Sequence, residues 1–238
     1  MERVKKGHLV INGIGSSNGG SFEDVLVNGV GTINGNIECE HLESSGKGHF
    51  KGNIVSESIK VNGTASFGGA ISGEKIDIEG SVKIKKNVQV HLLKVSGNST
   101  FGESVRGESI NIEGRISITE NCDAEQFHAR GPIKIGGELN GESILIEPYG
   151  NCSIGEIGGQ SISVKQSARL SHWLKPFFTS TLSVNSIEGD EIELESTIAK
   201  MVRGKNIKIG KKCEIDLVEY SDTFEVDNDA DVKEYRKV

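Results

Sequence analysis

Six glutamates share one position of a 17-residue spacing, and a histidine occupies the same position between them. The acidic column, as we call this set, consists of Glu40, Glu57, Glu74, Glu108, Glu125 and Glu142, with His91 in the gap. If the chain brings these residues side by side, the carboxylates could form a groove for a cation or for a basic segment of a partner. Like charges placed side by side repel one another, however. The alternative interpretation is a solvated edge that prevents lateral sheet pairing.

Other residue types that carry chemistry are scattered. The four cysteines, Cys39, Cys122, Cys152 and Cys213, form no C-x-x-C pair, and the six histidines form no pattern with carboxylates or cysteines. A metal site would need such clustering. We therefore expect no catalytic residue, no metal site and no cofactor.

The spacing of the acidic column belongs to a repeat that runs from Val25 to Pro148. Glycine recurs at intervals of 17 residues, at Gly29, Gly46, Gly63, Gly80, Gly97, Gly114 and Gly131. Apolar residues precede most of these glycines by two and four positions, and a bulky apolar residue follows each one by four. That last set is Ile33, Phe50, Phe67, Ile84, Phe101, Ile118 and Ile135. An internal repeat of this length is typical of a solenoid.

Within one repeat the apolar residues alternate with polar ones, which is the period of a β-strand. Each unit is therefore predicted to hold three short strands, with glycines at the corners supplying tight turns through positive φ. One unit cannot bury its inner face alone, so the units must stack. The prediction is an all-β fold, a single-stranded, three-sided parallel β-helix of 12 to 13 coils, about 60 Å long at the strand spacing.

The predicted domain organisation is one β-helix over residues 9–226. A short tail, 1–8, precedes it, and a charged tail, 227–238, follows it. The first repeat is one residue short, the phase slips by one residue beyond Pro148, and an apolar insertion at 166–181 interrupts the rhythm.

The insertion contains the one tryptophan of the sequence. Leu170, Trp173, Leu174 and Phe177 are spaced as one helical stripe, which favours a short helix packed on the β-helix. The alternative is an exposed apolar contact for a membrane or a partner, made by Trp173, Phe177 and Phe178.

Composition and pattern exclude several classes of function. Residues 1–6 lack the apolar region of a signal peptide, and no apolar run approaches the ~20 residues of a transmembrane helix, so a cytoplasmic location is expected. The net charge of -7 argues against nucleic acid as a partner. The repeat is not built from the hexapeptides of left-handed β-helix acyltransferases, no glycine-rich phosphate loop precedes a helix, and no small-molecule substrate is expected. We conclude that the protein is not an enzyme.

The repeat aliphatic-x-aliphatic-x-Gly, the expected location and the lack of a catalytic constellation together resemble the bactofilins, bacterial polymer-forming cytoskeletal proteins. The resemblance covers Leu9 to Leu139 closely and Ile144 to Val226 more loosely. The stretch Val202 to Tyr220 looks like the terminal coils of the long bactofilins of Gram-positive rods. The resemblance implies a right-handed β-helix that polymerises without nucleotide into non-polar filaments. It also implies a scaffold role in cell shape, polarity or motility, with the inner face of the cell membrane as a further location.

The ends of the β-helix are the predicted interfaces. An uncapped end exposes unpaired backbone groups above an apolar core, which favours addition of another copy. The residues expected there are Leu9 and Ile11 at one end and Phe224 and Val226 at the other. The partner would be a second copy of the chain or a paralogous protein. The alternative function is a β-helical binding module that does not polymerise and acts through a side face, like the β-helical domain of the septum-placement inhibitor.

Overall fold

The computed structural model describes residues 7–166 and 180–238. In these ranges the chain forms 21 β-strands and no helix, and no helix long and apolar enough to cross a bilayer occurs there. The strands stack in parallel as β-solenoid turns about 17 residues apart, about 13 turns in all. Contacts divide the chain into unit 1, Met1–Glu108 with Gly114–Ile118, and unit 2, Ser109–Glu113 with Thr119–Val238. Fold class and turn number are as predicted.

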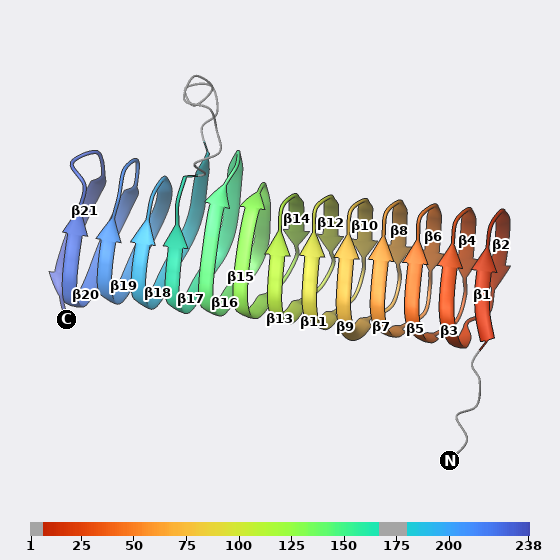
Figure 1. Cartoon of the computed structure of the whole chain (residues 1–238). Helices are drawn as coiled ribbons and strands as arrows, with labels where there is room; N and C mark the ends of the chain where they lie inside the picture. Colours follow the sequence, from red (N-terminus) through yellow and green to blue (C-terminus); the bar gives the residue numbers. More distant parts are fainter. Residues whose placement is uncertain (1–6, 167–179) are drawn as a thin grey trace, which may run out of the picture. The chain divides into compact units, whose positions relative to one another are not determined.

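Unit 1 alternates strands of eight and four residues after the first two strands. Strands β3, β5, β7, β9 and β11 lie side by side in one row (Figure 1), and each pairs with the next in parallel register. The bounds are β1 Gly7–Ile11, β2 Ile14–Ser17, β3 Gly20–Val27, β4 Val30–Ile33, β5 Ile37–Ser44, β6 Lys47–Phe50, β7 Ile54–Val61, β8 Thr64–Phe67, β9 Ile71–Ile78, β10 Ser81–Ile84, β11 Val88–Val95, β12 Asn98–Phe101, β13 Val105–Ile112 and β14 Arg115–Ile118. The last residues of β13 belong to unit 2.

The eight-residue strands turn a corner without ending. In β5 the buried residues Ile37 and Cys39 are followed by two residues that are not buried, Glu40 and His41, before burial resumes at Leu42. The pairing between β5 and β7 skips Glu40 in the same place. Two sides of each turn therefore belong to one strand, and the four-residue strand forms the third. Each repeat of unit 1 holds two strands and not the predicted three, because strand pairing continues on both sides of this corner.

Unit 2 is built mostly from longer strands, and those from β16 to β20 hold 13 to 16 residues each and continue across the corners of a turn. The strands of unit 2 are β15 Cys122–Gly131, β16 Ile133–Pro148, β17 Asn151–Val164, β18 Thr181–Leu194, β19 Thr197–Ile209, β20 Glu214–Val226 and β21 Asp231–Lys237. The predicted slip is present: Ile144 pairs with Ile162, 18 residues later. The insertion predicted at 166–181 lies almost wholly in 167–179, outside the described residues, and so do Trp173, Phe177 and Phe178.

The core consists of columns of like residues, as predicted. In unit 1, Phe50 pairs with Phe67, and their rings stack with centroids 4.8 Å apart. The whole bulky column from Ile33 to Ile135 is buried. In unit 2 the same position continues through residues paired in turn, namely Ile135, Ile154, Val184, Ala199, Ile215 and Val232. Each residue thus removes its predecessor's apolar surface from water, which is the main stabilising contribution of stacking.

Glycine is required at the repeating position for a different reason from the predicted positive φ. Of the seven repeating glycines, only Gly131 has a positive φ. At Gly46, Gly63 and Gly80 an added Cβ would collide with the carbonyl oxygen of the equivalent glycine one turn earlier. The 17-residue spacing of glycine therefore reflects close approach of the backbone between turns.

The prediction of a charged tail at 227–238 was wrong. Most of it forms β21, which pairs in parallel with β20 from Asp231 to Lys237. Most side chains of this segment are charged, so its sequence lacks the clear apolar alternation that predicts a strand. At the other end the first strand begins at Gly7, two residues before the predicted start.

Candidate assembly edges and side faces

The first turn of unit 1 presents an incompletely covered apolar edge. Strand β1 pairs with β3, and in the described part of the chain no strand pairs with its other side. Leu9 is half-buried, whereas Val25, its partner in the next turn, is fully buried. Ile14 is 91% exposed and Val10 is 48% exposed. We call this surface the N-terminal edge.

The N-terminal edge also carries a polar pair. The Nδ1 atom of His8 lies 2.8 Å from Oδ2 of Asp24, and its Nε2 lies 4.0 Å from Oε2 of Glu23. All three residues face outward from β1 and β3, at the rim around Leu9 and Ile11. An apolar centre with a polar rim is the usual anatomy of a protein interface.

The last turn of unit 2 presents the second edge, which we call the C-terminal edge. Phe224 is half-buried, Val226 is 49% exposed and Tyr235 is 63% exposed. The ring of Phe224 lies between two tyrosines, with its centroid 5.3 Å from that of Tyr220 and 5.1 Å from that of Tyr235. Tyrosine and phenylalanine are common anchors of interfaces because they bury a large area with few rotatable bonds.

A charged rim surrounds the C-terminal edge, because β21 carries Asp231, Lys233, Glu234, Arg236 and Lys237. Lys233 Nζ lies 2.7 Å from Asp216 Oδ1 in β20, and this contact raises the pKa of Lys233. Charged side chains on an outermost strand disfavour indiscriminate pairing.

Glu219 is the most buried carboxylate of unit 2, with a side chain only 5% exposed. Arg203 of β19 donates from Nε to its Oε2 at 2.7 Å, and Arg236 of β21 donates from Nε to its Oε1 at 2.8 Å. Hydrogen bonds from Arg236 and then Arg203 hold the pKa of Glu219 below its usual range. One carboxylate thus connects the last three strands of unit 2.

The acidic column is exposed except at Glu40, which is half-buried. In unit 1, His91 lies between two of its glutamates, with Nδ1 2.9 Å from Oε1 of Glu108 and Nε2 3.8 Å from Oε2 of Glu74. His91 takes the place of a glutamate in the column, so Glu74 and Glu108 each have the histidine and not a carboxylate as their neighbour on that side. The described residues hold no group of three or more potential ligands arranged for a metal ion.

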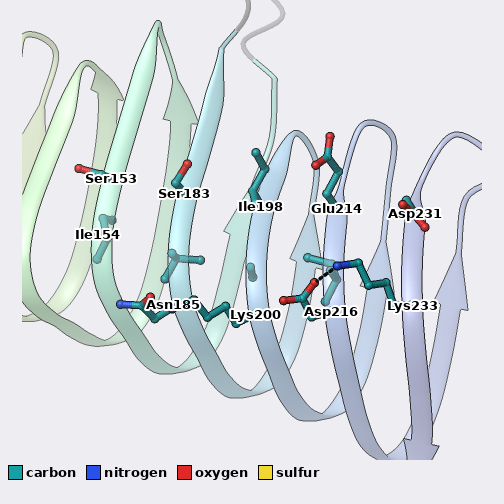
Figure 2. A pocket seen from close by; sticks show the side chains of 13 residues that line it. Ser153, Ile154, Ser183, Asn185, Ile198, Lys200, Glu214, Asp216, Asp231 and Lys233 are labelled. Carbon is teal, nitrogen blue, oxygen red and sulfur yellow. Dashed lines mark ion pairs between the residues drawn. The ribbon is translucent and has the colours of Figure 1, made fainter.

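One side face of unit 2 is hollowed (Figure 2). The open hollow, of about 560 Å³, lies where outward side chains are short, at Ser153, Ser183 and Asn185. Further along the same face, Ile198 and Lys200 stand beside the Asp216–Lys233 ion pair.

The cysteines are structural. Cys122 and Cys152 occupy inward positions of the repeat, and all four thiols are buried. Burial raises the pKa of Cys122 and Cys152 and raises that of Cys213 to about 11. Because the thiolate is the reactive form, burial and the raised pKa disfavour reaction of Cys122, Cys152 and Cys213 at neutral pH.

Comparison with known proteins gives one relative over the full length. The chain is 55% identical over 239 residues to the uncharacterized protein YhbE of Bacillus subtilis (strain 168), and the match covers 100% of both chains. The chain belongs to the YhbE family. A second B. subtilis protein, YhbF, is 39% identical over 85 residues, 36% of this chain and 34% of YhbF. No family model matches, and no solved structure matches.

The residues predicted from the sequence as interfaces lie in β1 (Leu9, Ile11) and in β20 (Phe224, Val226). Their role in assembly stays a prediction. Sequence reasoning missed Ile14, Tyr235 and Glu219. In the sequence, Glu219 stands between Arg203 and Arg236 at about one repeat from each, which could have indicated a stacked ion pair. The two spacings are 16 and 17 residues, so the three residues do not follow one exact period.

Proposed function

We propose that the protein is a bactofilin-like structural scaffold that assembles end to end, without nucleotide, through its two coil edges. Its cellular role would be to organise components of cell shape, polarity or motility in the cytoplasm or at the inner face of the membrane. This role is not enzymatic.

The distribution of exposed apolar side chains carries the proposal. Nine large hydrophobic side chains are exposed among the described residues, and five of them lie in the two terminal turns. Val10 and Ile14 belong to the first turn of unit 1, and Val226, Tyr235 and Val238 belong to the last turn of unit 2. Exposed apolar groups that gather in this way mark contact sites. Here they coincide with strand edges that can form backbone hydrogen bonds to another copy.

The proposal is supported by features that fit a scaffold. The core is a continuous set of stacked columns, and the buried thiols and the carboxylate of Glu219 are used for structure. Two proteins similar to this chain occur in one organism, B. subtilis, which fits a paralogous copy as an additional partner.

The experiment is sedimentation of the purified protein without nucleotide. The wild-type protein is expected in the pellet as large assemblies. Leu9→Lys, at an inward position of the N-terminal edge, should move it to the supernatant because a charge cannot be buried there without a partner. Ile11→Lys should do the same from an inward position of that edge. Val55→Lys, at an exposed apolar position away from both edges, is the matched control and should sediment like the wild type.

The second candidate function is a binding module that acts through a side face, and the hollow of unit 2 favours it. A protein of this kind would remain monomeric or dimeric at all concentrations. Ile198→Glu, inside the hollow, would then abolish binding of a partner without changing sedimentation. A wild-type protein that stays in the supernatant as a monomer would support this candidate and contradict the scaffold.

A further inference from the structure

We propose that the third side of unit 1, formed by its four-residue strands, binds the surface of an anionic lipid bilayer. The cationic side chains that make this contact, which we call the basic face, are Lys47, Lys51, Lys83, Lys85 and Arg115. The inference rests on the proposed function for a location at the membrane. It adds the surface of the protein that attaches and the chemistry of the lipid that this surface requires.

The first argument is the segregation of charge on the third side. In unit 1, the four-residue strands from β4 to β14 and the residues that directly follow them contain the five cations of the basic face and no Asp or Glu. The chain as a whole has a net charge of -7. Outward positions of the other sides mix the two signs, as in the column of Glu43, Lys60 and Asp77. The third side of unit 1 is therefore a positive surface on an acidic protein.

The second argument is that the cations of the basic face have no counterion among the described residues. All five side chains are exposed, and none of them forms an ion pair with another described residue. Elsewhere in unit 1, Lys60 Nζ lies 3.9 Å from Oε1 of Glu79, and Lys86 Nζ lies 2.6 Å from Oε1 of Glu103. Because neighbouring cations without counterions repel one another, a negative surface stabilises the basic face.

The third argument is the flat arrangement of the basic face. Strands β6, β8, β10, β12 and β14 lie side by side in one row (Figure 1), each paired in parallel with the next. This pairing places Lys47 and Arg115 in one column, four turns apart, and Lys83 in the neighbouring column between Ser66 and Thr100. The cations thus occur in every second turn, about 10 Å apart at the strand spacing.

The residues between the cations are short and polar. Thr64, Ser66, Ser81 and Thr100 separate them along the two columns, so the longer lysine and arginine side chains project furthest from the sheet. A plane of lipid headgroups therefore meets all the cations at once. The hydroxyl groups between them can donate hydrogen bonds to phosphate oxygens.

Nucleic acid is the other polyanion that such cations attract, and the third side fits it less well. Proteins that hold single strands stack bases on exposed aromatic rings, and many readers of duplex DNA insert a helix or a two-stranded ribbon into a groove. Among the described residues, the exposed Phe and Tyr side chains are Tyr149 and Tyr235, and both belong to unit 2. The third side of unit 1 is a paired sheet without such a ring.

The number of cations sets the expected strength of attachment. Each Lys or Arg near an anionic membrane surface strengthens binding by about fivefold, and the attraction falls off within a Debye length. One copy of the chain should therefore bind in a salt-dependent and reversible way. In an assembled filament every copy presents a basic face, and linked attachments that are weak one by one add up.

The test is flotation of the purified protein with vesicles of phosphatidylcholine that contain about one third phosphatidylglycerol. Floating vesicles carry bound protein upward, whereas assemblies without lipid sediment. The wild-type protein should float with these vesicles and not with vesicles of phosphatidylcholine alone. It should be released when the salt concentration rises from about 0.1 M to about 1 M. This salt dependence tests the role of charge without any substitution.

The variant removes three cations of the basic face together, Lys47→Thr, Lys83→Ser and Arg115→Asn. The same columns carry Thr, Ser and Asn in the adjacent turns, so these residue types fit the fold. The variant should bind the anionic vesicles about 100-fold more weakly than the wild type.

The matched control makes the same change in net charge on the other sides of unit 1, with Lys60→Thr, Lys75→Ser and Lys94→Asn. Its affinity should stay within about threefold of the wild type. Equal urea-unfolding midpoints of the two triple variants establish that both are folded.

Equal affinity of the wild type and the basic-face variant for anionic vesicles would overturn the proposal. So would a wild-type protein that binds DNA but not these vesicles, because the partner would then be nucleic acid. In both cases the scaffold stands if sedimentation without vesicles shows assemblies. Vesicle binding that depends on the three cations, in a protein that forms no assemblies, would instead contradict the proposed function and support the basic face as a membrane contact.

Discussion

Arg236 in β21 donates its Nε–H to Oε1 of Glu219 in β20, at 2.8 Å. The same carboxylate accepts from Arg203 in β19 at 2.7 Å. The charged segment at the end of unit 2 is thus attached to the solenoid by an ion-paired column in addition to its backbone ladder. This attachment positions Tyr235, and with it the C-terminal edge.

The low pKa of Glu219 predicts a pH dependence of stability. A carboxyl group whose pKa is lower in the folded than in the unfolded state stabilises the fold above its unfolded pKa. That contribution is lost as the pH falls through the folded pKa. Urea unfolding should therefore show that Glu219→Gln is less stable than the wild type at pH 7, with a difference that shrinks as the pH falls into the acidic range. Glu234→Gln, on exposed β21, should show no such trend. A constant difference at every pH would contradict the prediction.

Replacement of a stacked ring should open a cavity in unit 1. Phe67 is buried, and its ring stacks on that of Phe50. Phe67→Ala is expected to lower the free energy of unfolding by ~3–5 kcal/mol. Ser66→Ala, the half-buried neighbour, should change it by less than about 1 kcal/mol. An unfolding midpoint of Phe67→Ala equal to that of the wild type would remove this residue from the core.

The close approach at the repeating glycines predicts an asymmetry between turns. Gly80→Ala should lower the free energy of unfolding by about 1–3 kcal/mol, because the methyl group would displace the backbone of the preceding turn. Gly13→Ala should leave the stability of the monomer unchanged, since nothing lies within reach of its Cβ. Thermal unfolding of the two variants checks the prediction. Equal loss in both would show that conformational freedom, rather than close approach, maintains glycine at this position.

The buried thiols predict slow labelling. At pH 8 an aromatic disulfide reagent should leave all four cysteines of the native protein unmodified during a period in which the urea-unfolded protein reacts completely. Cys213, with a pKa of about 11, is mostly protonated under these conditions. Rapid labelling of one thiol per chain in the native protein would show a local opening and would contradict the prediction.

Much of the fold could be predicted because each turn repeats the same burial pattern. The spacing of Phe50 and Phe67 alone places one ring over the other, and both edge pairs followed from extending the same register. The role of glycine was wrongly interpreted, since a sequence does not distinguish a positive φ from a close backbone contact. Strand β21 was missed because its cohesion depends on ion pairs such as Lys233–Asp216, which leave no apolar alternation.

The direction of strand stacking in an assembled filament tests the central claim most directly. Paired strands repeat every ~4.8 Å along the stacking direction. Fibre diffraction from aligned filaments of the wild-type protein, formed without nucleotide, should place this reflection along the filament axis, because end-to-end assembly continues the stack from copy to copy. Filaments with the ~4.8 Å reflection perpendicular to their axis, or no filaments at all, would contradict end-to-end assembly.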